Sequence, residues 1–329
     1  MAPNATILGG IAGTGLTAAE RDFFRAADPW GFILFGRNVE SPDQVRRLTG
    51  DLRDAVGRDA VITVDQEGGR VQRLCGPYWT DWPAPLDQAA AGPRAMWLRY
   101  RLIGRELREV GIDSNCAPTL DVAQAETHPF LRNRCLGTDP ETVATLGRAA
   151  AEGMLAAGVL PVMKHLPGHG RAVADSHHAL PIVAAASDAL EAMDFAPFRA
   201  LNDLPMGMTA HIRFTALDDR PATASPVMIR LIRDRIGFDG LLMTDDITMN
   251  ALSGTAAERA AAAIAAGCDL VLHCNGTIAG MEPVVAAAGA LSPDAQRRAD
   301  AALAQRRAPQ DHDPAALMAE WRGLTTAPA

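Results

Sequence analysis

Short apolar segments, each bounded by Gly, Pro or Asp, recur along the chain. We assign eight of them as strands, over residues 5–10, 31–38, 60–69, 112–121, 159–168, 204–212, 240–247 and 268–275. Apolar residues mostly follow one another in these segments without alternating with polar ones. That pattern is typical of parallel strands that are covered on both faces.

Helical patterns lie between the apolar segments. The helix over 41–56 has Ser41 as its N-cap and Gln44 as the expected partner of a capping box, and its apolar residues fall on one stripe. We expect further helices over 94–111 and 139–158, and helices starting at Ser225 and Thr255, the last ending at Gly267. Strand and helix alternating eight times predicts the α/β class, as a (β/α)₈ barrel.

The chain is expected to form a single domain over residues 1–329. The barrel occupies about 5–290, and one or two Ala/Arg-rich helices form a C-terminal extension over about 291–329. No Ser/Gly linker divides the chain, and no repeat of fixed period appears. A length of 329 residues is normal for one barrel.

Composition narrows the possible partners and compartment. The net charge of −8, with no Lys/Arg run, argues against a nucleic-acid partner. The five cysteines are scattered, which suits packing in a reducing compartment and not a disulfide frame. Because no apolar run approaches the roughly 20 residues that cross a bilayer, and no secretion signal is seen, we expect a soluble cytoplasmic protein without membrane contact.

Ionisable residues follow five successive predicted strands. In a (β/α)₈ barrel the carboxyl ends of the strands meet at one rim and build the active site there. Such residues occur after the third to seventh strands: Asp65, Asp121, Lys164 with His165, His211, and Asp245 with Asp246. The sequence therefore predicts an active site at this rim.

One loop concentrates groups that can transfer protons. Residues 164–178 read KHLPGHGRAVADSHH. Asp175 and His177 lie two apart, and a carboxylate that holds one imidazole nitrogen leaves the other free for proton transfer; a surface turn beside an exposed histidine is the simpler alternative. His165 and His169 have a spacing that aligns metal ligands only on a helix, which Pro167 breaks. We expect no metal, and His169 to hold the loop through hydrogen bonds.

Several motifs together resemble one enzyme family. Besides KHLPGHG and DSH, they are GFILFGRN, DQEGGRVQR, APTLDV, MTAHI, GFDGLLMTDD and AGCDLVLHCN, which run in order over roughly residues 5–275. The chain resembles the glycoside hydrolase family 3 β-N-acetylglucosaminidases of bacterial peptidoglycan recycling. It departs from the family pattern at Leu166, at Thr244 and in NRCLG (133–137), which is a looser match around Arg134.

The resemblance implies a role for each matching residue. Asp245 would be the nucleophile, His177 the general acid/base, and Asp175 the residue that orients His177. The sugar would be bound by Asp65, Arg73, Arg134, Lys164 and His165. The implied reaction is removal of non-reducing N-acetylglucosamine from carbohydrate substrates such as muropeptides, with retention, through a glycosyl-aspartate and without a cofactor. Since the second domain of larger members is not found here, the loop itself would supply the acid/base.

Other interpretations of the same residues stay open. Lys164 at a strand end could form a Schiff base, as in aldolase-type barrels. A metal-dependent hydrolase and a sugar-binding protein without activity are also compatible with a barrel. A neutral imidazole base would let phosphate compete with water, so that the enzyme could act partly as a phosphorylase.

Overall fold

The computed structural model describes residues 2–176 and 178–326. Its main sheet has eight parallel strands in the order β3-β2-β1-β10-β9-β7-β5-β4. The bounds are β1 Asn4–Leu8, β2 Pro29–Leu34, β3 Val61–Val64, β4 Ser114–Asn115, β5 Leu160–Leu166, β7 Met206–Thr209, β9 Leu241–Asp246 and β10 Leu270–His273. Backbone bonds from Asp113 to Ile62 (3.0 Å) and from Cys116 to Val64 (2.9 Å) bring β4 beside β3. The sheet thus curls into the predicted barrel.

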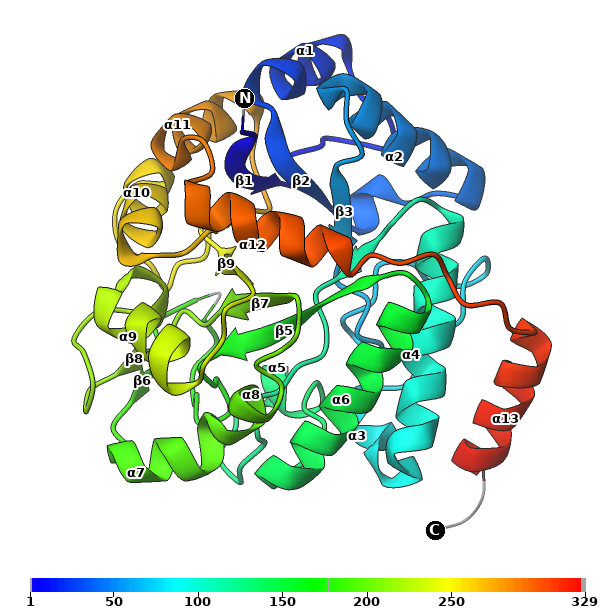
Figure 1. The fold of residues 1–329 in the computed structure, drawn as a ribbon, viewed down its shortest axis with the longest axis vertical. Coiled ribbons are helices and arrows are strands. Elements are labelled where there is room, and N and C mark those ends of the chain that lie inside the picture. The colour runs from blue at the N-terminus through cyan, green and yellow to red at the C-terminus, as the bar shows by residue number, and fades with distance from the viewer. Residues whose placement is uncertain (1, 177, 327–329) are drawn as a thin grey trace.

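Helices surround this barrel (Figure 1). The longer ones are α1 Ala18–Ala27, α2 Pro42–Val56, α4 Gly92–Glu109, α6 Pro140–Ala156, α10 Ala256–Ala266, α11 Ile278–Ala288, α12 Pro293–Ala304 and α13 Pro314–Thr326. Shorter α-helices are α3 Pro85–Gln88, α5 Pro129–Arg132, α7 Ser187–Ala189, α8 Ala196–Ala200 and α9 Pro226–Arg230. Single turns are η1 Gly36–Asn38, η2 Ala89–Ala91, η3 Leu190–Asp194, η4 Ala222–Ala224 and η5 Leu231–Arg235, and β6 Ile182–Val183 pairs with β8 Arg213–Phe214.

The predicted helix signals hold with one change. Ser41 caps α2 by accepting from the Gln44 backbone N–H at 3.3 Å. The Gln44 side chain, however, accepts from the backbone of Glu40 at 2.8 Å, so the expected capping box does not close on Ser41. Thr255 and Glu258 form a complete box on α10, and Gly267 ends that helix with φ +111°.

The fourth strand is much shorter than predicted. The apolar run suggested 112–121, but β4 ends at Asn115. Pro118 follows shortly after and has no backbone N–H to give to a neighbouring strand. The chain nevertheless stays beside β5, because Leu120 donates to the Lys164 carbonyl at 2.7 Å.

Two apolar layers make up the core. One lies between the strands and the outer helices. The other fills the barrel, and its members alternate along several strands, as in Leu160 and Val162 of β5 or Leu241 and Met243 of β9. Alternation places every second side chain of a strand in the barrel interior.

The helix α12 covers the amino-terminal end of the barrel and crosses it in Figure 1. Ala295, Ala299 and Ala302 pack against the interior layer. Arg298 pairs with Asp269 at 3.0 Å and Arg306 pairs with Asp59 at 2.5 Å, two aspartates that precede β10 and β3. With this end covered, the opposite rim is the one that can open to a substrate.

Over the described residues, no helix combines the length and the apolar character needed to cross a bilayer.

Candidate active site

Strand alternation carries three polar side chains to the top of the barrel interior. Lys164 continues the inward face of Leu160 and Val162, and Asp245 continues that of Leu241 and Met243. Asp65 follows β3 directly. All three line one cavity at the carboxyl end of the strands. Its other lining residues are Ile33, Arg70, Val71, Arg73, Phe130, Arg134, His165, His169, Ser176, Met208, Leu272 and Cys274.

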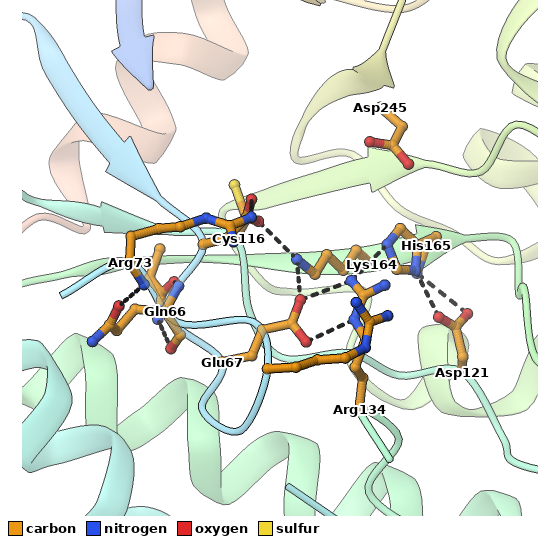
Figure 2. Close-up of polar contacts among 12 residues, drawn as sticks. Gln66, Glu67, Arg73, Cys116, Asp121, Arg134, Lys164, His165 and Asp245 are labelled. Carbon is orange, nitrogen blue, oxygen red and sulfur yellow. Dashed lines mark hydrogen bonds and ion pairs between the residues drawn. The ribbon is translucent and has the colours of Figure 1, made fainter. Parts of the chain in front are cut away.

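Glu67 lies between two cations on one side of the cavity (Figure 2). Its carboxylate accepts from Arg134 Nε at 2.9 Å and Nη2 at 2.8 Å, a bidentate pair, and lies 2.5 Å from Lys164 Nζ. Lys164 also contacts Asp65 at 3.1 Å, and Asp65 holds Arg73 at 3.0 Å. Charge-assisted bonds of this kind fix side-chain positions. The cluster therefore presents ordered cations and carboxylates to the cavity.

His165 is held by a buried carboxylate. Asp121 Oδ2 lies 2.6 Å from His165 Nδ1, and Asp121 Oδ1 accepts the backbone N–H of His169 at 2.6 Å. An imidazole fixed at Nδ1 has its Nε2 oriented, and here Nε2 lies 3.5 Å from Arg134. Asp121 thus links the carboxyl end of β4 to the loop that follows β5.

The two adjacent aspartates of β9 have different surroundings. Asp245 lines the cavity and faces the charged cluster in Figure 2, where it lies apart from the dashed network. It accepts the backbone N–H of Asp246 at 2.8 Å. The Asp246 carboxylate instead accepts from Thr248 Oγ1 at 2.6 Å and from the Cys274 backbone at 3.1 Å. Asp246 therefore holds the turn after β9, and Asp245 is the one presented to a ligand.

Neighbouring charges keep these carboxylates ionised despite burial. Burial raises the pKa of Glu67, but Arg134 and Lys164 outweigh burial and lower it to about 2. Burial also raises the pKa of Asp65, but Lys164 and Arg73 hold it below its usual range. Burial likewise raises the pKa of Asp245, but His211 and His165 hold it below its usual range. For Lys164, burial lowers the pKa, but Glu67 and Asp65 raise it above normal. At neutral pH the cavity holds charged groups.

The residues predicted to bind the sugar lie together. Asp65, Arg73, Arg134, Lys164 and His165 all line the cavity, including Arg134 from the loosely matching NRCLG segment. His177 lies outside the described residues. Its neighbour Ser176 is buried and lines the same cavity, and the charge of Asp175 acts on Arg70 at the cavity wall.

The prediction that His169 holds the loop through hydrogen bonds is confirmed for its backbone and not for its ring. Its backbone N–H donates to Asp121 at 2.6 Å, and its carbonyl accepts from Ala172 at 3.0 Å. Both of its ring nitrogens are buried without a hydrogen-bond partner among the described residues. Its ring instead packs edge-on against Phe130 and His165, at 6.0 and 5.6 Å between ring centres.

Sequence reasoning gave no role to Glu67, although this residue lies within the quoted DQEGGRVQR motif. The available signal was a second acid two residues after Asp65. Within residues 2–176 and 178–326, no group of three or more His, Cys, Asp or Glu side chains is arranged to hold a metal ion.

Comparison with known proteins identifies the family of the chain. Residues 21–305 match the model of the glycosyl hydrolase family 3 N terminal domain. A beta-hexosaminidase from Methylococcus capsulatus is 38% identical over 325 residues, covering 95% of both chains. A beta-hexosaminidase from Pseudomonas aeruginosa is 39% identical over 272 residues, which are 80% of this chain and 81% of that one.

Solved structures show the same fold. NagZ from Neisseria gonorrhoeae in complex with N-trifluoroacetyl-D-glucosamine superposes with a TM-score of 0.86 at 30% identity, covering 99% of each chain. A family 3 beta-N-acetylglucosaminidase from Paenibacillus gives a TM-score of 0.87 at 30% identity, over 98% of this chain and 68% of that one. The family model matches most of the chain, and the two relatives align over 95% and 80% of it. The chain therefore belongs to glycosyl hydrolase family 3.

Proposed function

We propose that the protein is a retaining exo-β-N-acetylglucosaminidase that works through a covalent intermediate on Asp245. The relatives are beta-hexosaminidases, and one related structure holds an N-acylated glucosamine. β-N-Acetylhexosaminidase activity follows from this likeness; the choice of N-acetylglucosamine, the intermediate and the residue roles are what we propose.

The position of Asp245 is the observation that carries the proposal. An ionised carboxylate projects into a cavity whose other side is lined with fixed hydrogen-bonding groups. A sugar bound by Asp65, Arg134 and Lys164 would have one face towards the carboxylate of Asp245. Glycoside cleavage needs an anion beside the anomeric carbon, where positive charge develops.

The reaction then runs as two displacements. Asp245 attacks the anomeric carbon while His177 gives a proton to the departing oxygen, and the bond between that carbon and the leaving group breaks. His177, now neutral, takes a proton from water, and the water oxygen displaces Asp245. Asp175 would hold the imidazole of His177 in the orientation that both steps need.

The Schiff-base alternative fits the site poorly. A lysine attacks a carbonyl only as a free amine. Two carboxylates flank Lys164 at 2.5 and 3.1 Å and raise its pKa above normal, so that it stays protonated. Because the charges of Lys164 and Arg134 are matched by Asp65 and Glu67, the site does not favour phosphate over water either.

The biological role is inferred from the family resemblance. We propose muropeptide fragments as natural substrates, with N-acetylglucosamine as the sugar removed and the cytoplasm as the place of action. The substrate and the compartment are inferred from the family resemblance, whereas the residues of the cavity support the binding of the sugar.

A substrate panel tests the proposed activity. p-Nitrophenyl β-N-acetylglucosaminide should be hydrolysed much faster than the corresponding β-glucoside, with the β-N-acetylgalactosaminide as a third substrate. Faster hydrolysis of the glucoside would contradict the proposal. Proton NMR of the first product should show the β-anomer, since two displacements retain configuration; an initial α-anomer would exclude the covalent route.

A further inference from the structure

His169 is a buried polar side chain that the reaction described above does not use. It is 2% exposed and lines the catalytic cavity beside His165, Ser176 and Asp245. Neither ring nitrogen has a hydrogen-bond partner in the described part of the chain. Buried polar atoms of native proteins are nearly always hydrogen-bonded, and an imidazole left without partners destabilises the fold.

The described groups around the ring of His169 do not bond to its nitrogens. Phe130 offers only an aromatic ring, and the Asp121 carboxylate is used by His165 and by the backbone of His169. Burial, followed by the neighbouring His165, lowers the pKa of His169 to about 4. The ring is therefore neutral at physiological pH, with one nitrogen that donates and one that accepts.

A neutral imidazole matches a hydroxyl group, which also donates and accepts. A half-turn about the Cβ–Cγ bond exchanges ring nitrogens and carbons within the same volume, and this torsion is broadly two-fold. The ring can thus present a nitrogen to the cavity without displacing Phe130 or His165. The cavity residues Asp65, Arg73, Arg134 and Lys164 are already held in ion pairs, whereas neither ring nitrogen of His169 has a partner among the described residues.

We propose that His169 is a further substrate-binding residue, which hydrogen-bonds one hydroxyl of the bound N-acetylglucosamine. The proposal rests on the function proposed above. His169 would bind this uncharged hydroxyl, and the neighbouring ion-paired residues would bind the other groups of the sugar. The unliganded protein tolerates the unpartnered imidazole, and the sugar supplies the missing partner.

Two opposite effects of one substitution test this role. His169→Phe keeps an aromatic ring against Phe130 and removes both nitrogens. Its melting temperature should equal or exceed that of the wild type, while its affinity for N-acetylglucosamine, measured by calorimetry, should fall about five- to tenfold, as for loss of one neutral hydrogen bond. His169→Asn, which keeps polar atoms near Nδ1, should recover part of the affinity. A purely structural histidine would instead give a lower melting temperature and unchanged affinity.

Deoxy sugars identify the hydroxyl. Among the 3-, 4- and 6-deoxy forms of N-acetylglucosamine, one should bind wild type and His169→Phe with equal affinity, because that sugar lacks the partner group. If the substitution weakens all three analogues as much as the parent sugar, or weakens none including the parent, the inference is wrong. Failure of the wild type to bind N-acetylglucosamine at all would contradict the proposed function instead, so the two failures can be told apart.

Discussion

At the scale of single residues, Asp245 and Asp246 show how one position along a strand decides a role. Asp245 shares the inward face of Leu241 and Met243, whereas Asp246 bonds to the turn that follows. The sequence alone, TDD at a strand end, does not say which aspartate points inwards. The resemblance selected the first, and the contacts of Asp246 explain why the second is occupied elsewhere.

Matched substitutions should separate these two roles. Asp245→Asn should lower kcat on the order of a thousandfold or more, as loss of a nucleophile does, with little change in melting temperature. Asp246→Asn should lose about 1–3 kcal/mol of stability, because an amide cannot accept all the bonds that this carboxylate receives. Assays with a p-nitrophenyl glycoside measure kcat, and urea denaturation measures the stability of each variant. Wild-type turnover by Asp245→Asn would move the nucleophile to another residue.

Glu67 should make stability depend on acidity. Arg134 and Lys164, acting against burial, lower its folded pKa to about 2 from an ordinary 4.5. The folded state thus keeps the carboxylate ionised to lower pH than the unfolded chain does. The resulting stabilisation is present in full above pH 4.5 and is lost as the pH falls from about 4.5 to about 2.

The variant Glu67→Gln should be less stable at pH 7 and should lose less further stability across that acidic range, as urea titrations at several pH values would show. Its KM should rise, since Arg134 and Lys164 lose the group that positions them. Glu320→Gln is a matched control, because Glu320 pairs with Arg94 on the surface and such pairs contribute little. Parallel pH curves for Glu67→Gln and wild type would contradict this account.

At the scale of elements, the loop between β3 and α3 is braced from behind by α4. Arg99 of α4 is fully buried and donates to the carbonyls of Glu67 at 2.7 Å and Pro83 at 2.6 Å. Gly68 has φ +102°, and a Cβ there would lie 1.9 Å from the Arg99 guanidinium. The backbone that presents Glu67 therefore depends on a glycine and an arginine outside the cavity.

Gly68→Ala should destabilise the protein by more than about 1 kcal/mol, from the left-handed backbone alone, and should also raise KM. Gly57→Ala is a suitable control: its φ is +65°, but a Cβ there meets nothing within 4 Å, and Gly57 ends α2 before the amino end of β3, whereas the cavity lies at the carboxyl end of that strand. It should lose stability with KM unchanged. Equal KM values for both variants, measured on the p-nitrophenyl substrate, would show that the brace does not position Glu67.

Local sequence signals identified most helices and strands, but they missed side-chain roles that depend on residues distant in sequence. All eight predicted strands overlap barrel strands, because apolar runs and caps are local. Glu67 and the ring of His169 were misjudged for the opposite reason. The ion pairs of Glu67 come from residues 67 and 97 positions further along the chain, and the missing partners of His169 become evident only when the cavity is assembled.

At the scale of the whole molecule, the C-terminal helices differ in what they contribute. The alanines of α12 complete the barrel interior, and Arg298 of α12 and Arg306 just after it pair with aspartates that precede strands. α13 lies against α4 at the outside of the molecule (Figure 1). There the ring centres of Trp321 and Trp82 lie 5.0 Å apart. We therefore propose that α12 belongs to the barrel domain and that α13 is an accessory brace.

Two truncations test this division. Removing residues 311–329 should lower the melting temperature by a few degrees and leave kcat close to wild type, since only Leu317 of α13 is buried. Removing residues 292–329 should abolish cooperative folding, because the interior layer would be open to water. Circular dichroism melts decide the matter, and a folded, active protein without α12 would contradict the assignment.

The proposed bond between Asp245 and the sugar can be trapped and located. A 5-fluoro N-acetylglucosaminyl fluoride slows the second displacement more than it blocks the first, so the glycosyl-enzyme should accumulate. Mass spectrometry of the digested protein should find one added sugar, with fragment ions placing it on Asp245, and Asp246→Asn should be labelled like wild type. A sugar attached to Asp246 or Asp65, or labelling that persists in Asp245→Asn, would contradict the account.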